Sequence, residues 1–205
     1  CTFNCRSIKN SLKDVLRLCD THDIICLQEH WLLPTELGRL NNIHKDFLGT
    51  GSSAVDITSD VLIGRPYGGT GILYRKTLCN KVNPVVVSNS RITGVKICTA
   101  NGPILVLTVY MPTDYNDDES MEKFIDTCAS LDALVTDCET PHVMLIGDFN
   151  CQLGSRFYDP LKHLVDDNNF VFTDLSLMSN ISNVFTYCSD NGRNFSWIDH
   201  VICSH

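Results

Sequence analysis

The apolar residues of this chain are gathered into short runs of strand length, and a polar residue ends each run. Examples are "IICLQE", which ends at Glu29, "PILVLTVY", which ends at Tyr110, and "VMLIGD", which ends at Asp148. Apolar runs of this length, bounded by turn-forming residues, indicate buried strands. None approaches the roughly 20 apolar residues of a membrane-spanning helix. The sequence therefore predicts a sheet-rich fold and no membrane partner.

The same pattern predicts where the strands lie. They are expected at 1–5, 23–29, 68–76, 82–88, 92–99, 103–111, 143–150 and 196–204. Those between 82 and 111 are separated by tight-turn signals such as Asn101-Gly102, which are typical of antiparallel neighbours.

Three segments have apolar residues at helical spacing instead. Helices are expected at 9–22, 117–138 and 156–168, and the second of these has acidic residues in its first turn. The glycine- and serine-containing segment 49–60 predicts a surface loop. Because strands outnumber helices without strict alternation, we expect an α+β sandwich, two packed sheets with helices outside. With 205 residues and 43% hydrophobic content, the chain suits a single domain over 1–205.

The cysteines indicate a reducing environment. There are eleven, an odd number, with no C-x-x-C pair, and most lie inside apolar stretches. This usage favours reduced, buried thiols over a disulfide framework. We therefore expect an intracellular location, in the nucleus and cytoplasm.

The net charge of −8 limits the classes of function. A protein that holds DNA by electrostatics alone needs many lysines and arginines on one face. A phosphodiester substrate is still compatible with an acidic chain, because a divalent cation held by carboxylates can supply the positive charge locally.

Polar residues recur where the apolar runs stop. They are Asn4, Glu29, Tyr110, Asp148, Asn150 and Asp199. Taken singly, most are explained as turn or cap residues, but Glu29 is not, because a lone buried carboxylate is costly. Two packed sheets bring several strand ends to one edge. We therefore predict that these side chains converge there and hold a hard, oxygen-preferring cation such as Mg²⁺.

Six motifs occur in an order that resembles a known superfamily. They are "FNCRS", "CLQEHWL", "YGGTGILYR", "TVYMPTD", "LIGDFN" and "SWIDHVICS". The chain is similar to the endonuclease/exonuclease/phosphatase superfamily, and most similar to the apurinic-endonuclease-like endonuclease domain of non-LTR (LINE-type) retrotransposons. The resemblance implies a DNase I-like, four-layered α/β-sandwich with two mostly antiparallel sheets flanked by helices. It also implies DNA nicking with Mg²⁺, or Mn²⁺ in its place, to prime reverse transcription. The implied partners are DNA and the rest of a polyprotein that includes a reverse transcriptase.

The resemblance also implies roles for individual residues. Glu29 should be the main metal ligand, with Asn4 beside it in direct contact or one water away. Asp148 should position and activate the attacking water, and Asn150 should hold the scissile phosphate.

Two further roles follow from the same resemblance. Tyr110 should hydrogen-bond a phosphate oxygen as negative charge develops in the transition state. Asp199 should orient a catalytic histidine. His30 and Trp31 either line the site or pack beside it.

The chain departs from the family pattern at two points. The family's catalytic histidine lies in an S-D-H motif, but this sequence stops at "CSH". His200 does not replace it, because neighbours in a strand point to opposite faces. We therefore expect a domain cut at both ends that lacks the S-D-H strand. The second departure is Arg6, which stands where repair endonucleases have an acid. Arg6 either grips a DNA phosphate or is a solvated surface residue.

Two other functions stay open. One is a different phosphoesterase of the same superfamily, such as an exonuclease III-like repair nuclease or a phosphatase. The other is a catalytically incomplete fragment that persists as an inert fold or a binding module.

Overall fold

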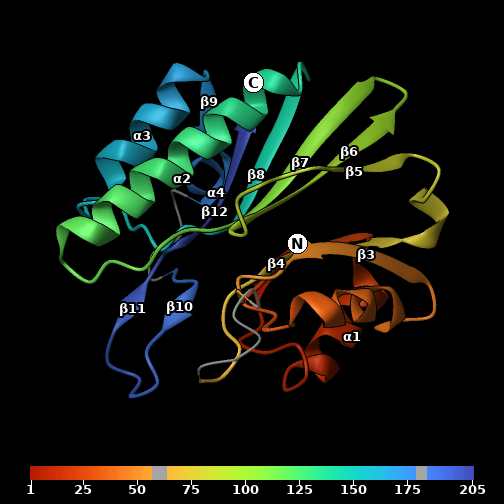
Figure 1. The fold of residues 1–205 in the computed structure, drawn as a ribbon. Coiled ribbons are helices and arrows are strands. Elements are labelled where there is room, and N and C mark those ends of the chain that lie inside the picture. Colours follow the sequence, from red (N-terminus) through yellow and green to blue (C-terminus); the bar gives the residue numbers. More distant parts are fainter. Residues whose placement is uncertain (57–63, 179–183) are drawn as a thin grey trace.

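The computed structural model describes residues 1–56, 64–178 and 184–205, and its strands form two large sheets (Figure 1). The smaller has four strands in the order β1 (Thr2–Asn4), β2 (Ile24–Gln28), β4 (Thr70–Arg75) and β3 (Phe47–Ser52). Strand β1 runs parallel to β2, and the other two pairs are antiparallel.

The larger sheet has six strands. Their order is β5 (Val82–Val85), β6 (Ile92–Thr99), β7 (Gly102–Tyr110), β8 (His142–Asp148), β12 (Asp199–Ser204) and β9 (Phe170–Phe172). Within the described residues, β7 and β8 are the only strands of this sheet that pair in parallel. Helix α2 (Asp118–Asp137) makes that crossover, as a parallel connection requires. The expectation of two mostly antiparallel sheets is confirmed.

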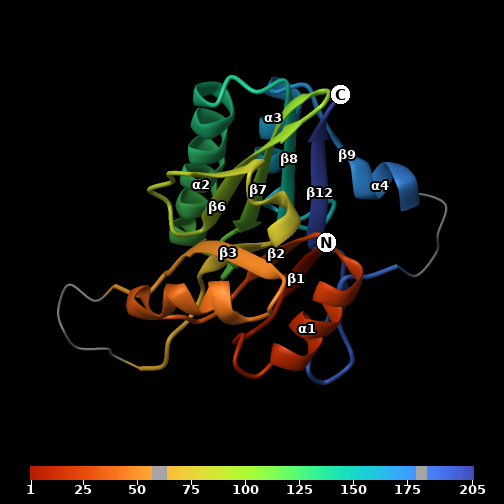
Figure 2. The same cartoon turned by 90° about the vertical axis from the view of Figure 1, so that its right-hand side faces the viewer.

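Helices cover the outer face of each sheet. Helix α1 (Leu12–Thr21) and the 3-10 helix η1 (Pro34–Asn42) lie outside the four-stranded sheet, whereas α2 and α3 (Tyr158–Asp167) lie outside the six-stranded one. Figure 2 shows α1 and α2 on opposite sides of the sheets. Two shorter helices are η2 (Lys76–Leu78) and α4 (Thr173–Met178). Within the described residues, no helix is both long and apolar enough to cross a membrane.

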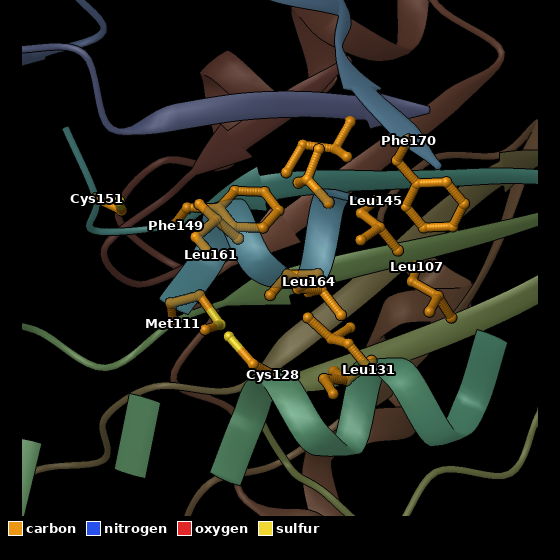
Figure 3. Close-up of a cluster of buried hydrophobic side chains, with 14 of the residues drawn as sticks. Leu107, Met111, Cys128, Leu131, Leu145, Phe149, Cys151, Leu161, Leu164 and Phe170 are labelled. Atoms are coloured by element: carbon orange, nitrogen blue, oxygen red, sulfur yellow. The ribbon is translucent and has the colours of Figure 1, made fainter. Parts of the chain in front are cut away.

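Three apolar cores separate the four layers. The first, drawn in Figure 3, lies between the six-stranded sheet and α2 and α3, and includes Leu107, Leu145 and Leu161. The second lies between the two sheets and contains Ile72 and Val106. A third packs α1 and η1 against the four-stranded sheet. The four-layered α+β sandwich is therefore confirmed.

Strand alternation brings polar residues to the rim between the sheets. In β7, Leu105, Leu107 and Val109 belong to the core under the helices, whereas Ile104 and Val106 belong to the core between the sheets. Because successive side chains alternate, Tyr110 continues the inner series. The same alternation carries the inner series of β8 from Met144 and Ile146 to Asp148.

The surface loop predicted at 49–60 is wrong for its first four residues, whereas residues 53–56 lie outside any helix or strand. Residues Gly49 to Ser52 belong to β3, and residues 57–60 lie outside the described part of the chain. A Cβ on Gly49 would lie 2.7 Å from Leu73 Cδ2 and 2.8 Å from Leu40 Cβ. This glycine allows close packing of the strand, so here glycine does not mark a loop.

The predicted strand 196–204 is also wrong as a single element. Its first residue belongs to β11 (Phe195–Ser196), which forms a hairpin with β10 (Tyr187–Cys188), and β12 begins only at Asp199. The hairpin, β9, α4 and the 3-10 helices were not predicted from the sequence.

All eleven cysteines are free thiols, as expected, but only some are buried. Five lie in the interior, and burial raises the pKa of Cys5 and of Cys26 to about 12. Cys79, Cys98 and Cys188 are exposed instead. The expectation of buried thiols therefore holds for about half of them.

Candidate active site

Three of the predicted residues lie side by side because of the strand register. Tyr110 at the end of β7 pairs with Asp148 at the end of β8, and Asp148 pairs with Asp199 at the start of β12. In the other sheet, Asn4 ends β1 beside Gln28, so Glu29 emerges next to Asn4. Both sheets thus present polar residues at the same edge.

All seven predicted site residues line one cleft at this edge. Its volume is about 640 Å³, and its lining includes Asn4, Arg6, Glu29, Tyr110, Asp148, Asn150 and Asp199. Segments that are up to 195 positions apart therefore meet, as the strand-end pattern predicts. Their individual catalytic roles stay predictions.

The Asn4 side chain joins the two sheets at the centre of the cleft. Its Nδ2 donates to Glu29 Oε1 at 2.8 Å and to Asp148 Oδ2 at 2.9 Å. Its Oδ1 accepts from the Arg6 amide at 3.3 Å. One amide nitrogen therefore holds two carboxylates from different sheets close together.

Asp148 is fixed by its neighbours in the "GDFN" stretch. Its Oδ1 accepts from the Asn150 amide at 2.9 Å, and Asn150 Nδ2 donates to the Met111 carbonyl at 2.8 Å. A Cβ at position 147 would lie 2.0 Å from the Val109 carbonyl oxygen, so only glycine allows β8 to approach β7 here. Asn150 adopts a left-handed conformation (φ 46°), which asparagine tolerates better than most residues.

The cleft concentrates negative charge in a poorly hydrated place. Burial, followed by the nearby Asp199, raises the pKa of Asp148 to about 7. Burial also raises the pKa of Asp199. Burial together with the Glu29 and Asp148 carboxylates raises the pKa of Tyr110, so its hydroxyl keeps its proton at neutral pH. Such an arrangement favours a bound cation.

The residues present fit a hard divalent metal ion. Their donors are carboxylate and amide oxygens, which Mg²⁺ and Mn²⁺ prefer. No three His, Cys, Asp or Glu residues of the described chain form a cluster that could enclose a metal. Mg²⁺ is commonly held by one or two carboxylates and several waters, a role for which Glu29 is suited. Since Asn4 turns its nitrogen to both carboxylates, it orients them as a donor.

Among the described residues, no histidine lines this cleft. His200 is 3% exposed and lies on the opposite face of β12 from Asp199, as the strand alternation predicts. Its Nδ1 lies 2.9 Å from Asp174 Oδ2, and its Nε2 lies 2.8 Å from the Cys151 carbonyl oxygen. It is therefore a packed residue with hydrogen-bonded ring nitrogens. Nothing in the sequence identified Asp174 as its partner, because the short helix α4 was not recognised.

His30 and Trp31 do not line the cleft either. His30 is 1% exposed, and its Nε2 faces the Ser52 and Thr70 carbonyl oxygens at 3.0 and 3.2 Å. Burial lowers its pKa, so the ring is neutral and packs behind the site. Trp31 packs next to Glu29.

The β10–β11 hairpin forms one wall that sequence reasoning missed. Thr186, Tyr187, Cys188 and Ser196 contribute to the lining. The Asn191-Gly192 dipeptide between the two short strands is a turn signal that could have revealed the hairpin.

Arg6 extends from the opposite wall to this hairpin. Its Nη1 lies 3.3 Å from Asp190 Oδ1, and its guanidinium lies 5.8 Å from the centre of the Tyr187 ring. Arg6 is exposed and lines the cleft, so it is accessible to a phosphate.

A second cleft of about 520 Å³ adjoins the first and shares Tyr110 and Thr113 with it. It is lined by Arg91 and by Tyr115 from the "TDYNDD" loop. The Arg91 guanidinium lies 5.5 Å from the centre of the Tyr110 ring.

Comparisons with known proteins agree with this geometry. The model of the endonuclease/exonuclease/phosphatase family matches residues 1–205, so the chain belongs to that family. The class of protein is thus a phosphoester-cleaving enzyme with a DNase I-like fold. No curated protein sequence matches the chain.

Solved structures share the fold at low sequence identity. The 3′ phosphatase NExo from Neisseria, bound to a product DNA hairpin, is 18% identical with a TM-score of 0.74, and the match covers 99% of this chain and 85% of that one. The APE2 catalytic domain from Xenopus laevis is 16% identical with a TM-score of 0.75, covering 100% and 81%. An AP endonuclease from Archaeoglobus fulgidus is 16% identical with a TM-score of 0.72, covering 99% and 85%.

These comparisons support the predicted family and fold, but not the predicted retrotransposon origin. The family and the fold are those that the ordered motifs predicted. Neither the family model nor these three structures point to a retrotransposon.

Proposed function

We propose that this protein is a divalent-metal-dependent phosphodiesterase that cleaves DNA. The proposal is carried by one observation, the Asn4 amide that holds the Glu29 and Asp148 carboxylates together at the junction of the two sheets. That junction offers an acidic, oxygen-lined site next to an exposed arginine. A phosphate with its metal ion matches both features.

Each residue then has a distinct task in hydrolysis. The metal ion, when bound, supplies positive charge that neutralises the phosphate. Glu29 holds the metal ion, and Asn150 contacts the scissile phosphate. Asp148 accepts a proton from the attacking water. The water oxygen bonds to phosphorus, the bond from phosphorus to O3′ breaks, and O3′ takes up a proton from solvent to become a 3′ hydroxyl.

Tyr110 and Asp199 affect the charges of the phosphate and of the Asp148 carboxyl, respectively. The protonated Tyr110 hydroxyl donates to a phosphate oxygen as negative charge develops on it. Asp199 contributes to the raised pKa of Asp148, which keeps that carboxyl basic.

Two finer functions compete for this site. The solved structures favour a repair-type nuclease or 3′ phosphatase, since their names describe a 3′ phosphatase bound to DNA and an AP endonuclease. Arg6 favours the nicking endonuclease of a LINE-type retrotransposon, which would act with a reverse transcriptase of the same polyprotein. The comparisons give more support to the repair-type function.

A plasmid assay tests the common proposal. With Mg²⁺, the protein should relax supercoiled plasmid, and Glu29→Gln and Asp148→Asn should each reduce the rate by about a hundredfold or more. Because no histidine lines the described part of the cleft, the assay is run with and without added imidazole. Equal cutting by wild type and both variants in each condition would remove the assignment.

A substrate panel separates the finer functions. Internal nicks in intact duplex, with ends that a polymerase extends, support the nicking endonuclease. Preferential removal of a 3′ phosphate, or incision only at abasic sites, supports the repair-type enzyme. A matched variant, Arg6→Gln, should weaken plasmid nicking more than it weakens 3′ phosphate removal if Arg6 grips an internal phosphate.

A further inference from the structure

The residues after β2 form a turn that is shaped around the Glu29 carboxylate. Glu29 and Trp31 both adopt left-handed conformations, with φ of 54° and 57°. Such conformations are costly for large side chains and persist only where the surroundings fix them. The turn is therefore held in place by contacts on several sides.

Main-chain hydrogen bonds provide part of that fixation. The Glu29 and His30 carbonyl oxygens accept from the Ser7 and Ile8 amides at 2.8 and 3.1 Å, and the Trp31 amide donates to the Gly68 carbonyl at 3.0 Å. The loop after β1 and the loop before β4 thus clamp the turn from both sides.

The His30 ring fixes the turn from inside. Its Nδ1 accepts from the Leu32 amide at 2.9 Å, while Nε2 faces two carbonyl oxygens. A Cβ on Gly69 would lie 2.4 Å from His30 Cε1, so this glycine leaves room for the ring.

The Trp31 side chain returns to the carboxylate that the turn presents. Its Nε1 donates to Glu29 Oε2 at 3.2 Å, while Asn4 Nδ2 donates to Glu29 Oε1 at 2.8 Å. Each carboxylate oxygen thus has its own donor. On the ring itself, the Arg65 guanidinium lies 5.1 Å from the centre. Trp31 is only partly buried and does not line the cleft. Packing alone therefore does not explain why its indole N–H points at the Glu29 carboxylate.

We infer that Trp31 is a positioning residue, which fixes the Glu29 carboxylate in the orientation that binds the metal ion. This inference rests on the proposed function of Glu29 as a metal ligand. Groups that hydrogen-bond a metal ligand orient it, and their loss commonly weakens metal affinity tenfold to a hundredfold. The remaining carboxylate lone pairs stay available to the metal ion.

Mn²⁺ binding, measured by electron paramagnetic resonance of the free ion, tests the inference without catalysis. Trp31→Phe keeps an aromatic ring but loses the N–H, and we expect about tenfold weaker Mn²⁺ affinity. In the cleavage assay, saturating Mn²⁺ should restore kcat and leave KM for DNA unchanged. Trp197→Phe is the matched control, since Trp197 Nε1 donates to the Asp199 main-chain oxygen and not to a carboxylate. Its Mn²⁺ affinity should equal that of wild type.

The outcomes separate this inference from the proposed function. If wild type binds Mn²⁺ more tightly than Glu29→Gln but Trp31→Phe equals wild type, only the inference fails. If Glu29→Gln binds as tightly as wild type, or wild type does not bind at all, both fail.

A second measurement is made on the wild-type protein, and a variant serves only to assign its signals. The chain has two tryptophans, so the ¹⁵N-labelled wild type gives two indole N–H signals, which are assigned with Trp197→Phe. Adding Mg²⁺ should shift the Trp31 signal and leave the Trp197 signal in place. An unmoved Trp31 signal in protein that binds Mg²⁺ would overturn the inference.

Discussion

The charge of the buried Asp148 carboxyl affects the stability of the metal-free protein. Only 5% of it is exposed, and burial beside Asp199 raises its pKa to about 7. The folded state therefore binds a proton more tightly than the unfolded state does. Ionising Asp148 destabilises the fold, an effect that is absent below the ordinary pKa near 4 and complete above about pH 7.

A pH series of unfolding experiments checks whether ionisation of Asp148 lowers the free energy of unfolding. In the presence of a chelator, Asp148→Asn should have nearly the wild-type free energy of unfolding at pH 4. By pH 8 it should exceed wild type by roughly 3 to 4 kcal/mol. Urea titrations between these pH values measure the difference. A difference that does not change with pH would contradict the raised pKa.

At the residue scale, the sequence predicted which polar side chains gather but not what holds them. Glu29 and Asp148 were recognisable because a carboxylate at the end of an apolar strand is costly to bury unless it is paired. The donors around them were not recognisable in the same way. Trp31 contacts Glu29 through a turn that distant loops hold in place, and its residue type does not signal such a role.

Gly147 shows how the site depends on one strand of the larger sheet. Gly147→Ala would drive a methyl group into the Val109 carbonyl, 2.0 Å away, and separate β8 from β7 just before Asp148. We expect a loss of about 3 to 5 kcal/mol in the free energy of unfolding, together with loss of DNA cleavage.

Gly38→Ala is the control, because nothing lies within 4 Å of the added group. Its stability should stay within about 0.5 kcal/mol of wild type. Urea unfolding of the three proteins measures both effects, and equal losses would exclude the clash.

At the element scale, long periodic segments were predicted well and short ones poorly. Helix α2 begins one residue after the expected start, where Asp117 caps it by accepting from the Ser120 amide at 2.8 Å. The hairpin strands β10 and β11 have two residues each, too few to show alternation. Strand β3 was missed because its glycines serve close packing, whereas glycine in a sequence usually signals a turn.

The docking of the two sheets sets the geometry of the whole molecule. Gln28 Nε2 donates to Thr108 Oγ1 at 2.8 Å, and both residues are fully buried between the sheets. This bond lies one residue before Glu29 and two before Tyr110, so it links the strands that carry them.

A double-mutant cycle measures that link. Gln28→Met removes the bonds of Gln28 to Thr108 and to Thr2, whereas Thr108→Val removes only the first. Each variant should cost about 1 to 3 kcal/mol. The double variant should cost less than the two single losses together, with a coupling free energy of about 1 kcal/mol. Urea unfolding of the four proteins gives the values. Strict additivity would mean that the bond does not help to dock the sheets.

The layered architecture was predictable from the sequence, but the contacts between its layers were not. Strand-length apolar runs and ordered motifs were enough for two sheets with outer helices. The alternation of side chains along each strand then places Tyr110, Asp148 and Asp199 on the inner face and His200 on the outer face. The pairing of Gln28 with Thr108 depends on how one sheet is rotated over the other, and no local pattern encodes that.

Residues 4 and 199 meet at one end of the interface between the two sheets, and this ties the proposed cleavage to completed folding. On the ribosome, the acidic cleft cannot assemble until almost every described strand has emerged. A molecule with a detached sheet would lack the cleft as well. The proposed chemistry is thus an all-or-none property of the native state, and the rate of phosphodiester cleavage would report the fraction of molecules that are fully folded.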